Sequence, residues 1–149
     1  RKDVLIMYTL SAFSTNLSNV VAGNAIPFNT IASQQGKACC GSGNNFTAGS
    51  TTVQLQSGVY KVHVNANVLG TVAGLFTLQL TNNNVNVGGA VASATTAVGS
   101  TANIGFDTII VVPRSCKCVS NNANLQVLVP TTSVSATLSN VNITVQKIC

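Results

Sequence analysis

Five cysteines are the residues in this sequence whose type and spacing suggest a covalent or metal centre. They form two close groups and one terminal residue: Cys39 with Cys40, Cys116 with Cys118, and Cys149. On a strand, side chains two residues apart point to one face, so the second group would present both thiols together. Adjacent cysteines rarely bridge each other, and disulfides between the two groups are therefore one expectation. Free thiols are the second.

A tetrahedral zinc site built from Cys39, Cys40, Cys116 and Cys118 is the third alternative. Structural zinc sites usually separate paired cysteines by two to four residues, and neither group has that spacing. We therefore expect no metal and no cofactor, and we treat these four cysteines as disulfide candidates. Cys149 is left as an odd thiol.

Acid and base groups are too scarce to indicate an enzyme. His63 is the single histidine, and Asp3 and Asp107 are the two acidic residues. A catalytic histidine needs a group that orients it, and the sequence places neither Asp107 nor a glutamate to do so. We expect His63 to face solvent or an interface, and Asp107 to cap a turn or pair with Arg114. A cysteine-dependent enzyme is the remaining catalytic alternative.

The composition also argues against nucleic-acid and membrane partners. The formal net charge is +5, but the seven basic residues are spread from end to end, and only 5% of residues are aromatic. Nucleic-acid surfaces need clustered basic groups and stacking platforms. No apolar run reaches the roughly 18 residues of a transmembrane helix. A polar surface built from Asn, Thr, Ser and Gln instead favours packing of identical subunits without strong self-repulsion.

The elements that would position these residues are all strands. Apolar and polar residues alternate from Tyr60 to Val68, which is typical of a half-buried antiparallel strand. We expect strands near residues 4–9, 26–31, 51–56, 58–69, 74–81, 85–92, 103–112, 123–130 and 136–148. About nine short strands in one domain predict an all-β sandwich or jelly roll. The last part of the segment 85–100 is expected to be a mobile loop.

Two of the expected strands lack this alternation. Apolar residues follow one another within 104–112 and again within 125–129. Such strands are covered on both faces, either inside the sandwich or at a subunit contact. This pattern favours an oligomer.

The order of elements across residues 24–148 resembles the globular heads of the complement and tumour necrosis factor superfamily. Five segments carry the resemblance: Ile26-Pro27-Phe28-Asn29-Thr30, Gly58-Val59-Tyr60-Lys61-Val62, the hairpin 75–87, Ile109-Ile110-Val111-Val112, and Val141-Asn142-Ile143-Thr144-Val145-Gln146-Lys147. It implies a jelly roll of nine to ten strands that forms a homotrimer. Residues 24–149 would be the head, and residues 1–23 an N-terminal arm or docking strand.

The cysteine positions resemble the phage members of that superfamily, which often carry cysteine after the first loop and a close pair after an Ile/Val strand ending in arginine. The matching segments are Gly36-Lys37-Ala38-Cys39-Cys40 and Val111-Val112-Pro113-Arg114-Ser115-Cys116-Lys117-Cys118. The resemblance implies a non-enzymatic virion structural protein of a tailed bacteriophage, used as a head fibre, decoration or tail knob. Bacterial spore-surface or adhesion heads of the same fold are the alternative.

The virion interpretation also implies partners and an environment. The partners would be other virion proteins and a host cell-surface receptor or glycan, contacted through the loops 41–50, 92–101 and 121–124. A particle outside the cell is oxidised, which is consistent with disulfides. Near a threefold axis, Cys149 would meet its symmetry copies.

Overall fold

The computed structural model describes residues 8–36, 46–113 and 122–148. These residues form nine strands: β1 (Thr9–Val20), β2 (Thr30–Gln35), β3 (Val53–Leu55), β4 (Gly58–Gly70), β5 (Gly74–Asn82), β6 (Val85–Thr96), β7 (Thr101–Val112), β8 (Ala123–Leu128) and β9 (Ala136–Lys147). No helix that could cross a membrane occurs in the described part of the chain. The all-β prediction is confirmed.

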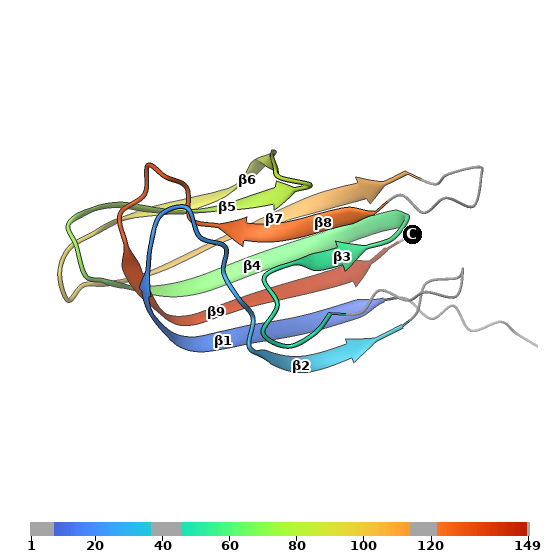
Figure 1. Cartoon of the computed structure of the whole chain (residues 1–149), viewed down its shortest axis with the longest axis horizontal. Helices are drawn as coiled ribbons and strands as arrows, with labels where there is room; N and C mark the ends of the chain where they lie inside the picture. The colour runs from blue at the N-terminus through green and yellow to red at the C-terminus, as the bar shows by residue number, and fades with distance from the viewer. Residues whose placement is uncertain (1–7, 37–45, 114–121, 149) are drawn as a thin grey trace, which may run out of the picture.

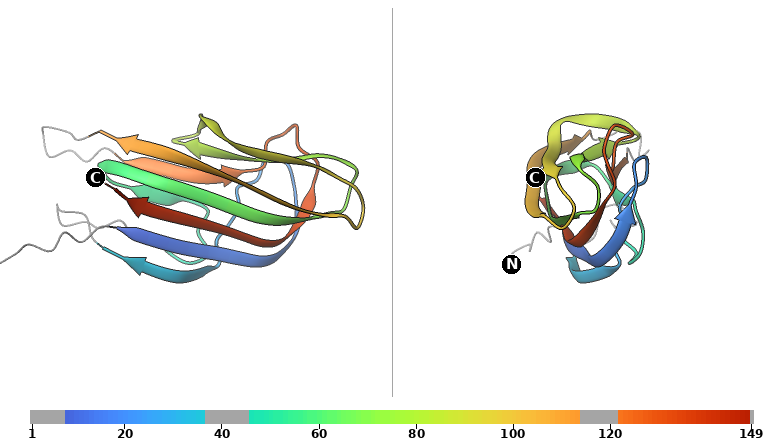
Figure 2. Two further views of the ribbon diagram at one scale, coloured as in Figure 1. Left: turned by 180° about the vertical axis from the view of Figure 1, so that it is seen from behind. Right: turned by 90° about the vertical axis from the view of Figure 1, so that its left-hand side faces the viewer.

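The strands form two antiparallel sheets that face each other in an elongated sandwich (Figures 1 and 2). The five-stranded sheet has the order β2-β1-β9-β4-β7, and the four-stranded sheet has the order β3-β8-β5-β6. Strand β9 lies between β1 and β4, so the last of the described strands forms the centre of the five-stranded sheet. These long-range pairings produce the expected jelly roll.

The core lies between the sheets and follows the alternation of the sequence. In β4, Tyr60, Val62 and Val64 are fully buried, and they face a layer from the other sheet that includes Phe76 and Leu125. Burying one such side chain stabilises the fold by about 1.5–3 kcal/mol. The opposite side chains of β4 therefore remain on the outside of the sandwich.

Strand β7 is covered on one face only within the chain, although its sequence led us to expect cover on both. Ile110 and Val112 are buried, whereas Ile109 is 51% exposed and Val111 is 62% exposed. The reason is topological, because the described strands form two layers and only the inner face of β7 meets the four-stranded sheet.

The Ile-Pro-Phe-Asn-Thr segment is a crossing between sheets rather than the strand expected at 26–31. The Ile26 N–H donates to the Val127 carbonyl of β8, while Thr30 pairs with Phe13 of β1. Between them, the Ser14 hydroxyl donates to the Pro27 carbonyl at 2.7 Å and accepts from the Asn29 N–H at 2.8 Å. A segment whose hydrogen bonds go to both sheets cannot join one ladder, so β2 starts only at Thr30 (Figure 1).

The bounds of β1 and β6 also differ from those expected. The first strand runs from Thr9 to Val20 instead of over residues 4–9, of which 4–7 lie outside the described residues. It pairs with both β2 and β9, so most of the segment 1–23 belongs to the five-stranded sheet. Strand β6 continues to Thr96 through pairs such as Ala94 with Phe76, which leaves a tight turn where we expected a mobile loop.

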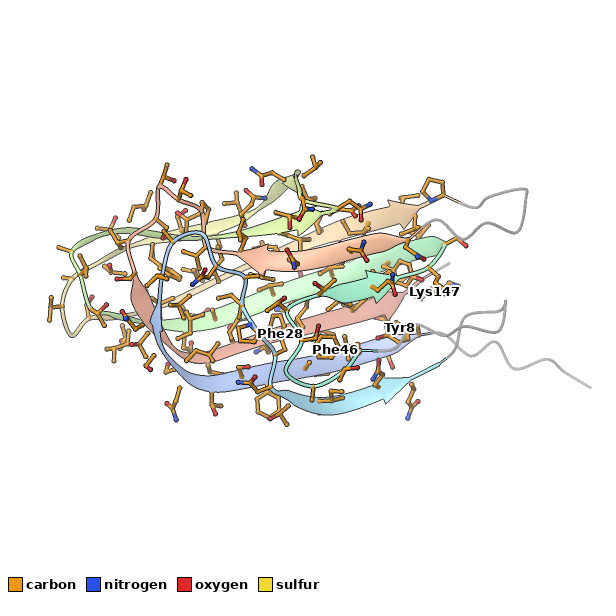
Figure 3. All side chains as sticks on the ribbon, in the orientation of Figure 1. Tyr8, Phe28, Phe46 and Lys147 are labelled. Atoms are coloured by element: carbon orange, nitrogen blue, oxygen red, sulfur yellow. The ribbon has the colours of Figure 1, made fainter. Side chains whose placement is uncertain are left out.

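Many of the strand ends lie together at one end of the sandwich. The pairs Thr9 with Gln35, Thr9 with Gln146 and Gly58 with Val112 place the starts of β1 and β4 beside the ends of β2, β9 and β7. Near that end, the Lys147 N–H donates to the Tyr8 carbonyl at 2.8 Å. Phe28 and Phe46 meet edge to face, with ring centroids 6.5 Å apart, and fill the space next to β2 (Figure 3).

Candidate functional site

The side of the five-stranded sheet that points away from the four-stranded sheet is the candidate site, and we call it the outer face. The strand register arranges its side chains in rows across β7, β4 and β9. From one end of the sheet to the other, the rows are Val111-Val59-Ile148, Ile109-Lys61-Gln146, Asp107-His63-Thr144, Gly105-Asn65-Asn142 and Asn103-Asn67-Asn140. Along the strands, the side chains of the outer face therefore change from apolar at one end, through charged, to amides at the other end.

The central row contains a hydrogen-bonded pair that the sequence analysis did not predict. His63 lies directly opposite Asp107, and its Nδ1 is hydrogen-bonded to Asp107 Oδ1. Asp107 is therefore placed to orient His63, which the sequence alone did not indicate, and it lies inside a strand instead of capping a turn. A carboxylate can only accept, which assigns the proton to His63 Nδ1 and leaves Nε2 as an acceptor in the neutral ring. Arg114, the expected partner of Asp107, lies outside the described residues.

This pair borders an open hollow of about 330 Å³. The hollow is lined by Lys61, His63, Asp107, Thr144 and Gln146. A second hollow of about 480 Å³ shares Thr144 and extends over β1 beside Phe13. The outer face is therefore a shallow surface that suits a broad partner.

The amide rows are partly satisfied within the chain. Asn103 Nδ2 donates to Asn65 Oδ1 at 2.9 Å and to Asn67 Oδ1 at 2.6 Å. Asn140 Oδ1, in the same row, is buried and accepts no hydrogen bond. A buried acceptor left unpaired costs about 1–3 kcal/mol.

The arrangement gives little support to catalysis. His63 has the carboxylate that orients a general base, but no serine, threonine or cysteine hydroxyl or thiol among the described residues is hydrogen-bonded to it. The side chains of His63 and Asp107 are 43% and 59% exposed, so solvent screens the pair. The same residues are better suited to polar contacts on a flat surface.

The cysteine predictions concern residues outside the described part of the chain. Cys39, Cys40, Cys116, Cys118 and Cys149 all lie outside the described residues. The strands that precede them, β2, β7 and β9, terminate at the same end of the five-stranded sheet. Within residues 8–36, 46–113 and 122–148, no three His, Cys, Asp or Glu side chains gather as a metal site. The disulfide and metal alternatives remain predictions.

The His63–Asp107 pair leaves no signal in the local sequence, because the two residues are 44 positions apart. Both lie in strands that the alternation predicts. Their pairing depends on which strands are neighbours and in which register, and neither is visible in a local pattern. The alternation alone would have placed His63 on the outside and no more.

No protein-family model matches the chain, and no curated protein matches its sequence. Solved structures do share its fold. The globular domain of zebrafish complement 1qA matches with a TM-score of 0.62 at 10% identity, covering 95% of each chain. The Eiger tumour necrosis factor of S. frugiperda matches with a TM-score of 0.62 at 14% identity, covering 97% of this chain and 92% of the other.

The third structure is vertex protein P5 of PRD1. It matches with a TM-score of 0.56 at 15% identity, covering 97% of this chain and 99% of P5. At these identities the comparisons establish the fold alone. The chain has the jelly-roll fold of complement and tumour necrosis factor-like heads, as the sequence resemblance predicted.

Proposed function

We propose that this chain is a non-enzymatic structural protein of a bacteriophage particle, a trimeric head domain that copies of the chain build through the outer face. The observation that carries the proposal is the match to a phage vertex protein over nearly the full length of both chains. The other virion proteins and a host receptor or glycan are the proposed outside partners.

The outer face supports self-association through its chemistry. Ile109 and Val111 expose apolar surface at one end, and the amide rows at the other end offer both donors and acceptors. Amides are self-complementary, so the same residues on another copy can pair with them without opposing charge.

Sedimentation of the purified full chain tests the assembly. We expect a species of about three times 15.2 kDa at micromolar concentration. A folded monomer at that concentration would contradict the trimer.

Localisation tests the virion role. Antibodies raised against the purified protein should label intact phage particles in electron micrographs, and its peptides should appear in the mass spectrum of purified particles. Labelling of spore or cell surfaces instead would support the alternative of a bacterial surface head, and labelling of neither would contradict a display function.

A further inference from the structure

We infer that acid weakens the association of copies through the outer face, and that His63 is the group that senses it. This inference rests on the proposed function, because it assumes that copies meet on this face. It concerns how the contact is regulated, and it follows from the position of one titratable side chain among very few charges.

The surroundings of His63 determine the charge of the contact. Among the described residues, Lys61 on its own strand β4 and Asp107 on β7 are its charged neighbours on this face. Strand β9 contributes Thr144 and Gln146, which are uncharged. The cluster therefore has a net charge of zero while His63 is neutral, since +1 and −1 cancel, and a net charge of +1 once His63 is protonated.

Protonation also changes the hydrogen bonding that His63 offers. With Nδ1 donating to Asp107, the neutral ring presents Nε2 as an acceptor, whereas the imidazolium presents it as a donor. Any group of a second copy that donates to Nε2 at neutral pH loses its partner in acid. The change in charge and the change in hydrogen bonding both weaken the association of copies in acid.

In an assembly of identical copies, each copy brings the same cluster. Each protonation adds one positive charge to the contact, and like charges across an interface oppose association because water there screens them less than in bulk. The effect is spread over all copies, so the assembly responds more steeply than one site would.

The composition makes this response unusually easy to isolate. The whole chain contains one histidine and two acidic residues, Asp3 and Asp107. Histidine is the side chain that ordinarily changes its charge between about pH 5 and pH 8. A change in association between about pH 7 and about pH 5 can therefore be assigned to His63 by a single substitution.

The test is analytical ultracentrifugation of the full chain at about pH 7.5 and about pH 5, with circular dichroism at both pH values to confirm that the protein stays folded. We expect the dissociation constant of the assembly to rise at least about tenfold in acid, which corresponds to about 1.4 kcal/mol. In His63→Gln, which cannot take up a proton here, the ratio of the two constants should fall to about one. Lys147→Gln removes a charge away from the outer face and should keep the response of the unchanged protein.

The outcomes separate this inference from the proposed function. A monomer at both pH values would overturn the assembly itself. An assembly that forms at neutral pH and is equally stable or more stable in acid would overturn the role of His63 alone. An acid response that persists in His63→Gln would also overturn that role.

Discussion

At the scale of single residues, the buried hydroxyl of Tyr8 makes the stability of the fold depend on pH in the alkaline range. Tyr8 is almost fully buried, and its hydroxyl donates to Gln34 Oε1 at 2.8 Å. Burial, and to a smaller extent the nearby Tyr60, raise the pKa of Tyr8 above its ordinary value. A pKa that is higher in the folded state than in the unfolded chain stabilises the fold fully below the unfolded value, which is about 10. That stability is lost as the pH rises beyond it.

We therefore predict that Tyr8→Phe flattens the alkaline loss of stability. At neutral pH the variant should lose about 1 kcal/mol, because one buried hydrogen bond disappears. Above about pH 10 the free energy of unfolding should fall less steeply with pH than in the unchanged protein. Urea denaturation at a series of pH values measures both. Other tyrosines, lysines and thiols titrate in both proteins, so equal slopes would show that Tyr8 does not contribute.

The cysteines carry a second prediction at this scale. If Cys39 or Cys40 is bridged to Cys116 or Cys118, alkylation before and after reduction will give different masses for the peptides that contain them. Removing one bridge should cost about 2–5 kcal/mol, less where the core already holds the strands. Labelling of all five thiols without reductant would exclude the bridge, and stoichiometric bound zinc would favour the metal site.

At the scale of elements, the close pairing of β4 with β7 depends on a glycine. Gly105 lies directly opposite Asn65, in the row next to His63 and Asp107. A Cβ atom at Gly105 would lie 2.7 Å from the Val64 carbonyl oxygen and 3.0 Å from Asn65 Nδ2. The first of these atoms belongs to the backbone, so the strands would have to separate to accept a side chain.

We predict that Gly105→Ala destabilises the protein by about 1–3 kcal/mol, the usual cost of inserting a methyl group where there is no room. Gly88→Ala in β6 is the control, because a Cβ there meets nothing within 4 Å. The control should be neutral or slightly stabilising, since alanine restricts the unfolded chain. Urea denaturation compares the two variants, and equal stability would mean that β7 shifts without cost.

At the scale of the whole molecule, the two outward surfaces of the sandwich differ in what they offer a partner. The outer face of the five-stranded sheet carries Lys61, His63 and Asp107 together with the amide rows. Along β5 and β6, the outward surface of the other sheet includes Thr77, hydrogen-bonded to Ser93 at 2.9 Å. The outward surface of the four-stranded sheet therefore serves as a control for the proposal that copies meet on the outer face.

We predict that Thr144→Arg prevents assembly and that Thr95→Arg does not. Both threonines are exposed and lie in strands, Thr144 in the centre of the outer face and Thr95 in β6 on the opposite sheet. Each variant adds one arginine, whose charge and bulk oppose a close contact only where a contact exists. Light scattering should give a monomer mass for Thr144→Arg and the unchanged mass for Thr95→Arg. The reverse result would place the contact on the four-stranded sheet.

The alternation of apolar and polar residues determined most of the secondary structure by itself. It predicted β4, β5 and β9 almost to their ends, because half-buried strands need one apolar face and local sequence records that need. It also predicted the fold class, since nine short strands in one domain have few ways to pack. It failed for Ile26–Thr30, whose hydrogen bonds go to two different sheets.

What only the tertiary structure decided was which strands are neighbours. The pairing of β4 with β7 brings His63 and Asp107 together across 44 positions, and the two-layer packing of the sheets leaves the outward side chains Ile109 and Val111 exposed. Residue types determine which face of a strand is buried, because burial of apolar surface acts locally on each side chain. Strand order and register arise from contacts along the whole chain, so the charged row of the outer face appears only once the sheets are assembled.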